Sequence, residues 1–178
     1  MRMLESEIEG GHPKPRVLFR YANELVEQGR PEDAGRAYRD YLDADRNPGA
    51  DRYWAQVSLA ELSRSLGDEA TTREVALQAI GEDPSRAEAY ITLGLHYYDR
   101  DQWSKAAPLF IAATATSQPT SGITRNPDYL YVAWDYLSVC LDRLERRQEA
   151  LDAARRALPN NPDSARVRAN MHWFIDNL

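Results

Sequence analysis

Residues 85–119 read SRAEAYITLGLHYYDRDQWSKAAPLFIAATATSQP, and this stretch decides the fold. Apolar residues recur at helical spacing on both sides of a polar break at 99–101. The pattern predicts two amphipathic helices joined by a short turn, an αα-hairpin. Gly94 is small where two helix backbones must come close, whereas Trp103 and Phe110 are large where a gap between helices must be filled.

The same spacing returns along most of the chain. Units in phase with this hairpin start at Pro15, Tyr53, Ala87 and Tyr131. Counted from Ala87, small residues fall at positions eight, twenty and twenty-seven, and a proline follows near thirty-two. This pattern resembles the tetratricopeptide repeat. One such hairpin cannot bury its apolar face alone, so stacked neighbours are expected.

The resemblance implies an all-α fold, a right-handed α-solenoid of four tetratricopeptide-like helix hairpins plus a C-terminal capping helix. We expect an acidic linker or frayed lead-in at 1–14 and a repeat domain at 15–178. The repeat units should span about 15–52, 53–86, 87–130 and 131–162.

The capping helix should cover about 164–177, because a terminal repeat needs a helix with a polar outer side. Four apolar residues are expected on its packed side: Val167, Met171, Phe174 and Ile175. Four polar residues are expected on its outer side: Arg166, Arg168, Asn170 and Asp176.

The segment 117–127 contains two prolines and a glycine, which predicts a loop inserted before the fourth unit. It is either a harmless insertion between repeats or a binding loop, since long loops are often functional.

Composition limits the classes of partner and compartment. The chain has 178 residues and a formal net charge of −6, which argues against a nucleic-acid backbone as the partner. No apolar run is long enough for a membrane span, and no signal-peptide pattern is present. A single cysteine, Cys140, cannot form an internal disulfide, so a reducing, cytoplasmic compartment is expected.

Catalytic chemistry finds no support in the sequence. The three histidines, His12, His96 and His172, lie in distant units, so we expect no metal site. Cys140 lies among apolar residues and is expected to be a buried, inert thiol. No glycine-rich phosphate loop or Gly-x-Ser-x-Gly motif is present, and we predict no catalytic residue and no cofactor.

The stretch HPKPRVLFRYANEL at 12–25 resembles the start of the repeat region in some bacterial family 2 glycosyltransferases. The insertion before the fourth unit, followed by Tyr129, Tyr131 and Trp134, is similar as well. In that family the repeats follow a nucleotide-sugar-using catalytic domain and are regarded as an acceptor-binding or dimerising part. No such catalytic domain is present in these 178 residues.

The remaining candidate function is recognition of a binding partner. In tetratricopeptide repeats the first helix of each hairpin lines a concave face, which implies a groove that binds a protein or peptide. The implied groove residues are Arg16, Phe19, Asn23, Trp54, Glu61, Arg64, Glu88, Tyr98 and Asp135. The alternative is that these side chains only pack between repeats. The chaperone-tail carboxylate clamp is matched only at Asn23, so an acidic C-terminal tail is not the expected ligand.

Three functions follow from these observations. The first is a non-catalytic module of a glycosyltransferase-like protein that binds a protein or peptide, an attached catalytic domain or a second copy of itself. The second is a free-standing cytoplasmic adaptor, and the third, which the sequence favours least, is an enzyme in its own right.

Overall fold

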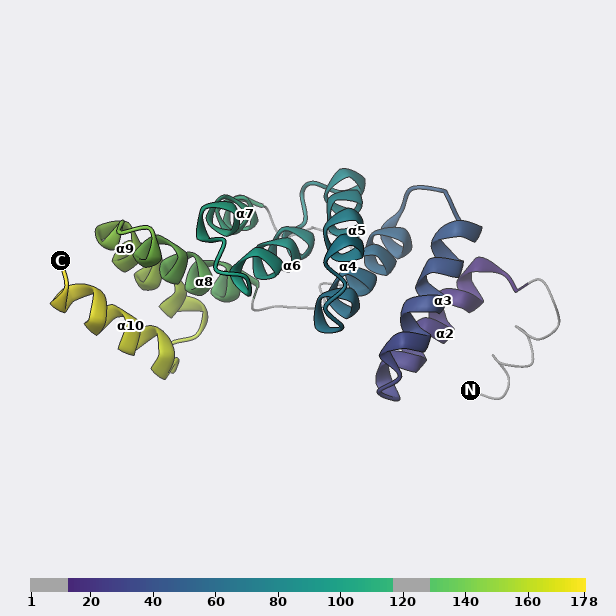
Figure 1. Cartoon of the computed structure of the whole chain (residues 1–178), viewed down its shortest axis with the longest axis horizontal. Coiled ribbons are helices and arrows are strands. Elements are labelled where there is room, and N and C mark those ends of the chain that lie inside the picture. Colours follow the sequence, from purple (N-terminus) through teal and green to yellow (C-terminus); the bar gives the residue numbers. More distant parts are fainter. Residues whose placement is uncertain (1–12, 117–128) are drawn as a thin grey trace. The chain divides into compact units, whose positions relative to one another are not determined.

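The computed structural model describes residues 13–116 and 129–178, and every regular element in these ranges is a helix (Figure 1). The predicted loop at 117–127 and most of the predicted lead-in at 1–14 lie outside the described residues. The chain divides into two compact units, with the boundary between Asp83 and Pro84.

The first unit contains two helical hairpins. Its helices are α2 (Pro15–Glu27), α3 (Pro31–Ala44), α4 (Ala50–Ser65) and α5 (Glu69–Glu82). Each helix packs against the next one along the chain, as expected of a repeat protein. α2 and α3 begin with proline, whose missing N–H costs nothing in a first turn. The side chain of Asp68 caps α5 by accepting a hydrogen bond from the Thr71 N–H at 3.1 Å.

The second unit contains two further hairpins and one additional helix. Its elements are α6 (Ala87–Tyr98), α7 (Trp103–Ala115), α8 (Tyr129–Arg143), α9 (Arg147–Ala157), the short 3₁₀ helix η1 (Leu158–Asn160) and α10 (Ala165–Asp176). Ser164 caps α10 by accepting a hydrogen bond from the Val167 N–H at 3.2 Å. Pro108 lies inside α7, where it is exposed.

The turn inside each hairpin contains one residue in the left-handed backbone region. These residues are Gly29 (φ 67°), Gly67 (φ 77°), Asp101 (φ 55°) and Glu145 (φ 61°). Each is the fifteenth residue of its predicted repeat unit. The next residue in every turn donates its N–H to the carbonyl five residues earlier, at 2.8–3.0 Å. The same turn geometry therefore recurs in all four hairpins.

Two of these turns have a residue other than glycine, Asp101 or Glu145, at the position where glycine is preferred. A non-glycine residue in the left-handed region costs roughly 1–2 kcal/mol, and the greater freedom of glycine in the unfolded chain offsets part of this. We expect Glu145→Gly to raise the free energy of unfolding by about 0.5–1 kcal/mol in urea denaturation. The matched control is Gly67→Ala, which should lower it, because a Cβ there meets no atom within 4 Å and only the backbone is strained. A destabilised Glu145→Gly variant would contradict this account of the turn.

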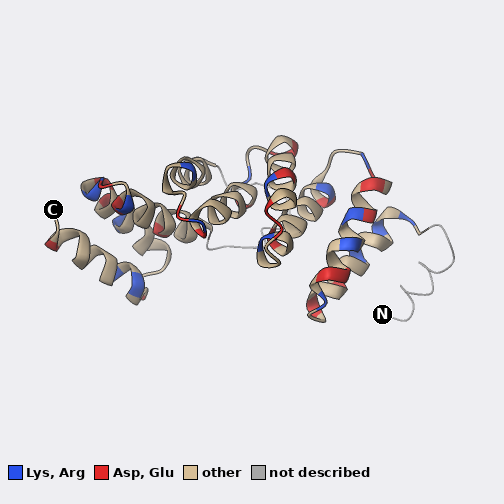
Figure 2. Cartoon of the chain, in the orientation of Figure 1, with Lys and Arg blue, Asp and Glu red and all other residues tan. Residues whose placement is uncertain are grey.

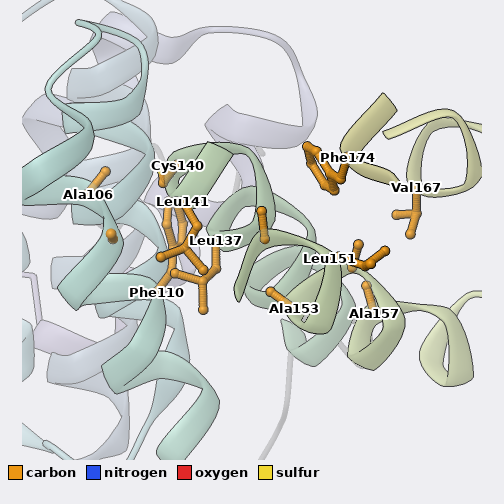
Figure 3. Close-up of a cluster of buried hydrophobic side chains, with 13 residues drawn as sticks. Ala106, Phe110, Leu137, Cys140, Leu141, Leu151, Ala153, Ala157, Val167 and Phe174 are labelled. Atoms are coloured by element: carbon orange, nitrogen blue, oxygen red, sulfur yellow. The ribbon is translucent and has the colours of Figure 1, made fainter. Parts of the chain in front are cut away.

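A continuous apolar core runs through the second unit (Figure 3). It joins residues of four helices, including Phe110 of α7, Leu137 of α8, Leu151 of α9 and Phe174 of α10. α10 therefore covers the last hairpin, as predicted for a capping helix. Ile175, however, is 50% exposed, so its predicted place on the packed side is wrong.

Candidate functional site

The predicted groove residues of α2 lie close to α3. The half-buried Phe19 ring lies 6.1 Å from Tyr38 and 5.3 Å from Tyr41, measured between ring centroids. Asn23 Oδ1 accepts a hydrogen bond of 2.8 Å from the Tyr38 hydroxyl. Phe19 and Asn23 thus help to join the two helices of the first hairpin, whereas Arg16 is exposed.

The predicted groove residues of α4 differ in their surroundings. Trp54 is buried, with its ring edge-on to that of Tyr53 at 5.4 Å. Glu61 is exposed and Arg64 is half-buried. A common surface for these residues, the α2 residues and Tyr98 stays a prediction.

In the second unit, Tyr98 lies in a cluster of aromatic rings from α6, α7 and α8. Its ring is edge-on to Trp103 at 5.0 Å and to Tyr136 at 4.7 Å. Tyr136 in turn stacks on the buried ring of Phe110 at 5.7 Å. Burial raises the pKa of Tyr98, so its hydroxyl remains protonated at neutral pH. Tyr98 is only half-buried, and it therefore presents part of an ordered aromatic surface.

An ion pair ties α10 to this cluster. Arg166 donates a hydrogen bond to Oδ2 of Asp135, which is fully buried on α8. The Arg166 guanidinium also lies 4.8 Å from the centroid of the Tyr136 ring, a cation–π contact. Burial lowers the pKa of Arg166, but the Asp135 carboxylate outweighs this and raises it above the ordinary value. The Tyr131 and Ser164 hydroxyls, 2.9 Å apart, add a second polar link between α8 and the start of α10.

Three predicted groove residues are buried. Trp54 is 5% exposed, Glu88 is 7% exposed and Asp135 is not exposed at all. Arg166 covers Asp135, so this carboxylate is not open to a ligand. For these three residues, burial supports the alternative that they pack inside the protein.

The structure adds two residues that the sequence argument did not place in the site, Tyr136 and Arg166. Arg166 is exposed, as expected for the outer side of the capping helix, and its guanidinium also reaches Asp135 and Tyr136. The spacing contained a signal for it. Ala165 follows Tyr131 by 34 residues, one repeat length, so α10 continues the phase as a fifth first helix with Arg166 at its second position.

The residues considered for catalysis, Cys140 and His96, are buried in the protein. Cys140 is fully buried, and burial raises the pKa of its thiol to about 12, so it remains protonated and unreactive. This confirms its predicted burial. His96 is buried as well. Within residues 13–116 and 129–178, no three histidine, cysteine or carboxylate side chains gather as a metal site. No helix in the described part of the chain is long and apolar enough to cross a membrane.

Charged side chains are frequent on α3 and sparse on α6 and α7 (Figure 2).

In the first unit, α3 and α5 border an open cleft of about 530 Å³ with Leu59 of α4 among its lining residues. Arg52 at this cleft donates hydrogen bonds to the carbonyls of Leu42 and Asp45, at 3.0 and 2.6 Å. Its Nε also lies 3.6 Å from Glu82, so its charge is compensated within the unit. We therefore assign Arg52 a structural role.

Comparison with known proteins gives matches in structure only. No protein-family model and no curated protein matches the sequence. MamA from Desulfovibrio magneticus RS-1 is similar in structure, with a TM-score of 0.75 and 16% identity over 93% of this chain and 86% of that one. PilF of Pseudomonas aeruginosa has a TM-score of 0.73 and 16% identity, over 92% of this chain and 68% of that one.

A third solved structure, the Cut9–Hcn1 hetero-tetramer of the APC/C, has a TM-score of 0.69 and 15% identity. That match covers 92% of this chain and 30% of the other. At such identities the likeness concerns the fold alone. Together with the helical hairpins described above, it shows that the chain has the all-α solenoid fold of tetratricopeptide-repeat proteins.

Proposed function

We propose that the chain is a non-catalytic scaffold that binds a protein or peptide through residues of its first helices. One observation carries the proposal: α6, α8 and α10 bring Tyr98, Tyr136 and Arg166 together as a partly exposed aromatic and cationic surface. Aromatic and arginine side chains dominate the binding energy of protein interfaces.

The surface is ordered before a partner arrives. Tyr98 and Tyr136 hold each other edge-on, and Arg166 is fixed by Asp135 beneath it. Because these side chains are already held in place, binding loses less conformational entropy than it would with free rotamers. The net charge of −6 favours a protein over a nucleic acid as the partner. We also propose a reducing, cytoplasmic location, supported by the single buried thiol of Cys140.

We further propose that this scaffold is the interaction module of a glycosyltransferase-like protein, where it would contact the acceptor or an attached catalytic domain. The resemblance of residues 12–25 to the repeat regions of those enzymes supports this. A free-standing adaptor is the alternative. Sequencing the gene upstream of the codon for Met1 separates the two, because an in-frame, strand-rich catalytic domain is expected only for the first.

Partner capture by the immobilised chain tests the binding proposal. Tyr98→Ala and Tyr136→Ala should each reduce capture of a specific protein from an extract of the source cell, while circular dichroism shows an intact helical fold. Arg155→Ala is the matched control, because Arg155 is an exposed arginine of the second helix α9. Capture that is equal for all variants would contradict the proposed surface. Equal capture together with a lowered melting temperature would show that these side chains serve packing alone.

A further inference from the structure

The last helix of the described residues, together with the C-terminal residues after it, carries a concentration of exposed apolar side chains. Seven large apolar residues are exposed in the described ranges, and three of them lie within the last six residues. They are Trp173, Ile175 and Leu178, with 57%, 50% and 65% of their surface exposed. Among the described elements, α10 packs against α9 and α8, and these apolar side chains remain uncovered.

The two faces of α10 differ sharply. Val167 and Phe174 point into the core of the second unit, as Figure 3 shows for both. Helical periodicity places the opposite face along four residues that are all exposed: Ala165, Ala169, His172 and Asp176. Trp173 and Ile175 lie on the two flanks of this outer face. The outer face thus carries two alanines, with a large apolar side chain on each flank.

The charges of α10 run against the dipole of the helix. Arg166 and Arg168 lie in its first turn, and Asp176 is its last residue. A helix favours acidic residues at its N-terminus and basic residues at its C-terminus, so this arrangement does not stabilise the isolated helix. Arg168 Nη2 lies 3.9 Å from the fully exposed Asp163, which is a distant, solvated pair. The charge order therefore fits a second helix that runs in the opposite direction.

We propose that α10 pairs with α10 of a second copy of this chain, in an antiparallel contact related by a twofold axis. A twofold axis level with Met171 and His172 sets Trp173 of each copy over the small Ala169 of the other. The same axis brings Arg168 of each copy beside Asp176 of the other, and the two helix dipoles then oppose each other favourably. This pairing covers exposed apolar residues of α10, and neither Tyr98 nor Tyr136 takes part in it.

The contact is small, because α10 has 12 residues. Interfaces of such size give weak, transient association, so we expect a dimer that forms and dissociates with protein concentration. Self-association is independent of the proposed partner-binding surface, and one can fail without the other.

Sedimentation equilibrium of the whole chain over a range of concentrations tests the pairing. Arg168→Glu and Asp176→Arg should each weaken the dimer roughly tenfold, because each replaces two symmetry-related attractions by repulsions. The double variant Arg168→Glu/Asp176→Arg should return the dimerisation constant to within about threefold of the original value, since the reversed charges again face each other. Trp173→Ala should abolish dimerisation at the same concentrations.

The charge variants carry an internal control. Both single reversals improve the fit of α10 to its own dipole, so a weaker dimer cannot result from unfolding of the helix. A chain that remains monomeric at every concentration would overturn the proposal. So would a dimer whose double variant associates as weakly as the single variants, because its contact would lie elsewhere.

Discussion

Replacing Gly94 with leucine is expected to destabilise the second unit by about 1–3 kcal/mol or more. A Cβ atom at Gly94 would lie 2.8 Å from Cε1 and 3.0 Å from Cζ of Phe110. The Phe110 ring is fully buried and stacks on Tyr136, so it has no free space into which it can retreat. Even alanine meets this contact, and leucine adds three further carbon atoms between α6 and α7.

Urea denaturation of Gly94→Leu and Gly94→Ala measures the effect, and a double-mutant cycle locates it. Phe110→Leu makes room beside Gly94, so Gly94→Ala should cost less in the Phe110→Leu background than in the original chain. The matched control is Gly81→Ala in α5, where a Cβ would meet no atom within 4 Å. Additive effects of the two substitutions would show that the contact between Gly94 and Phe110 does not limit stability.

Loss of the capping helix should have the second large effect. Removing residues 164–178 uncovers buried core residues of α9, including Leu151, and takes Arg166 away from the buried carboxylate of Asp135. Breaking a buried ion pair from one side costs roughly 3–5 kcal/mol, and exposed apolar surface promotes association. We expect a lower melting temperature and aggregation that size-exclusion chromatography detects.

Substitution of two adjacent residues of α10 tests the contribution of core packing while the helix itself remains in place. Phe174 is 2% exposed and Trp173 is 57% exposed. Phe174→Asp should cost roughly 3 kcal/mol or more, because it replaces a core ring with a charge. Trp173→Asp should change the stability of the monomer by less than about 0.5 kcal/mol. Equal effects of the two substitutions, or a truncated chain that remains folded and monomeric, would show that α10 is not a cap.

The hairpin register was predictable from the sequence because it rests on local spacing. Gly94 and Phe110 mark a close helix crossing within one hairpin, and the turn residue at position fifteen recurs in all four units. Both features depend on backbone geometry that a short stretch of sequence encodes. The all-α solenoid fold followed from these repeats.

The surroundings of individual side chains were less predictable. Asp135 occupies a position that faces the groove in the repeat pattern, yet Arg166 from another helix covers it. Ile175 is apolar and was placed on the packed side. Among the described elements, however, α10 packs against α9 and α8, and its buried residues are Val167 and Phe174. Such outcomes depend on which helix lies opposite, and periodicity within one helix does not specify that.

Site-specific photo-crosslinking in the source cell tests the central claim, that the first-helix surface around Tyr98 binds a protein. A photoreactive phenylalanine analogue placed at position 98 should form a covalent adduct with a specific protein. The same analogue at position 155, on the outer face of α9, should not. Adducts that are identical at the two positions, or found only at position 155, would contradict the account.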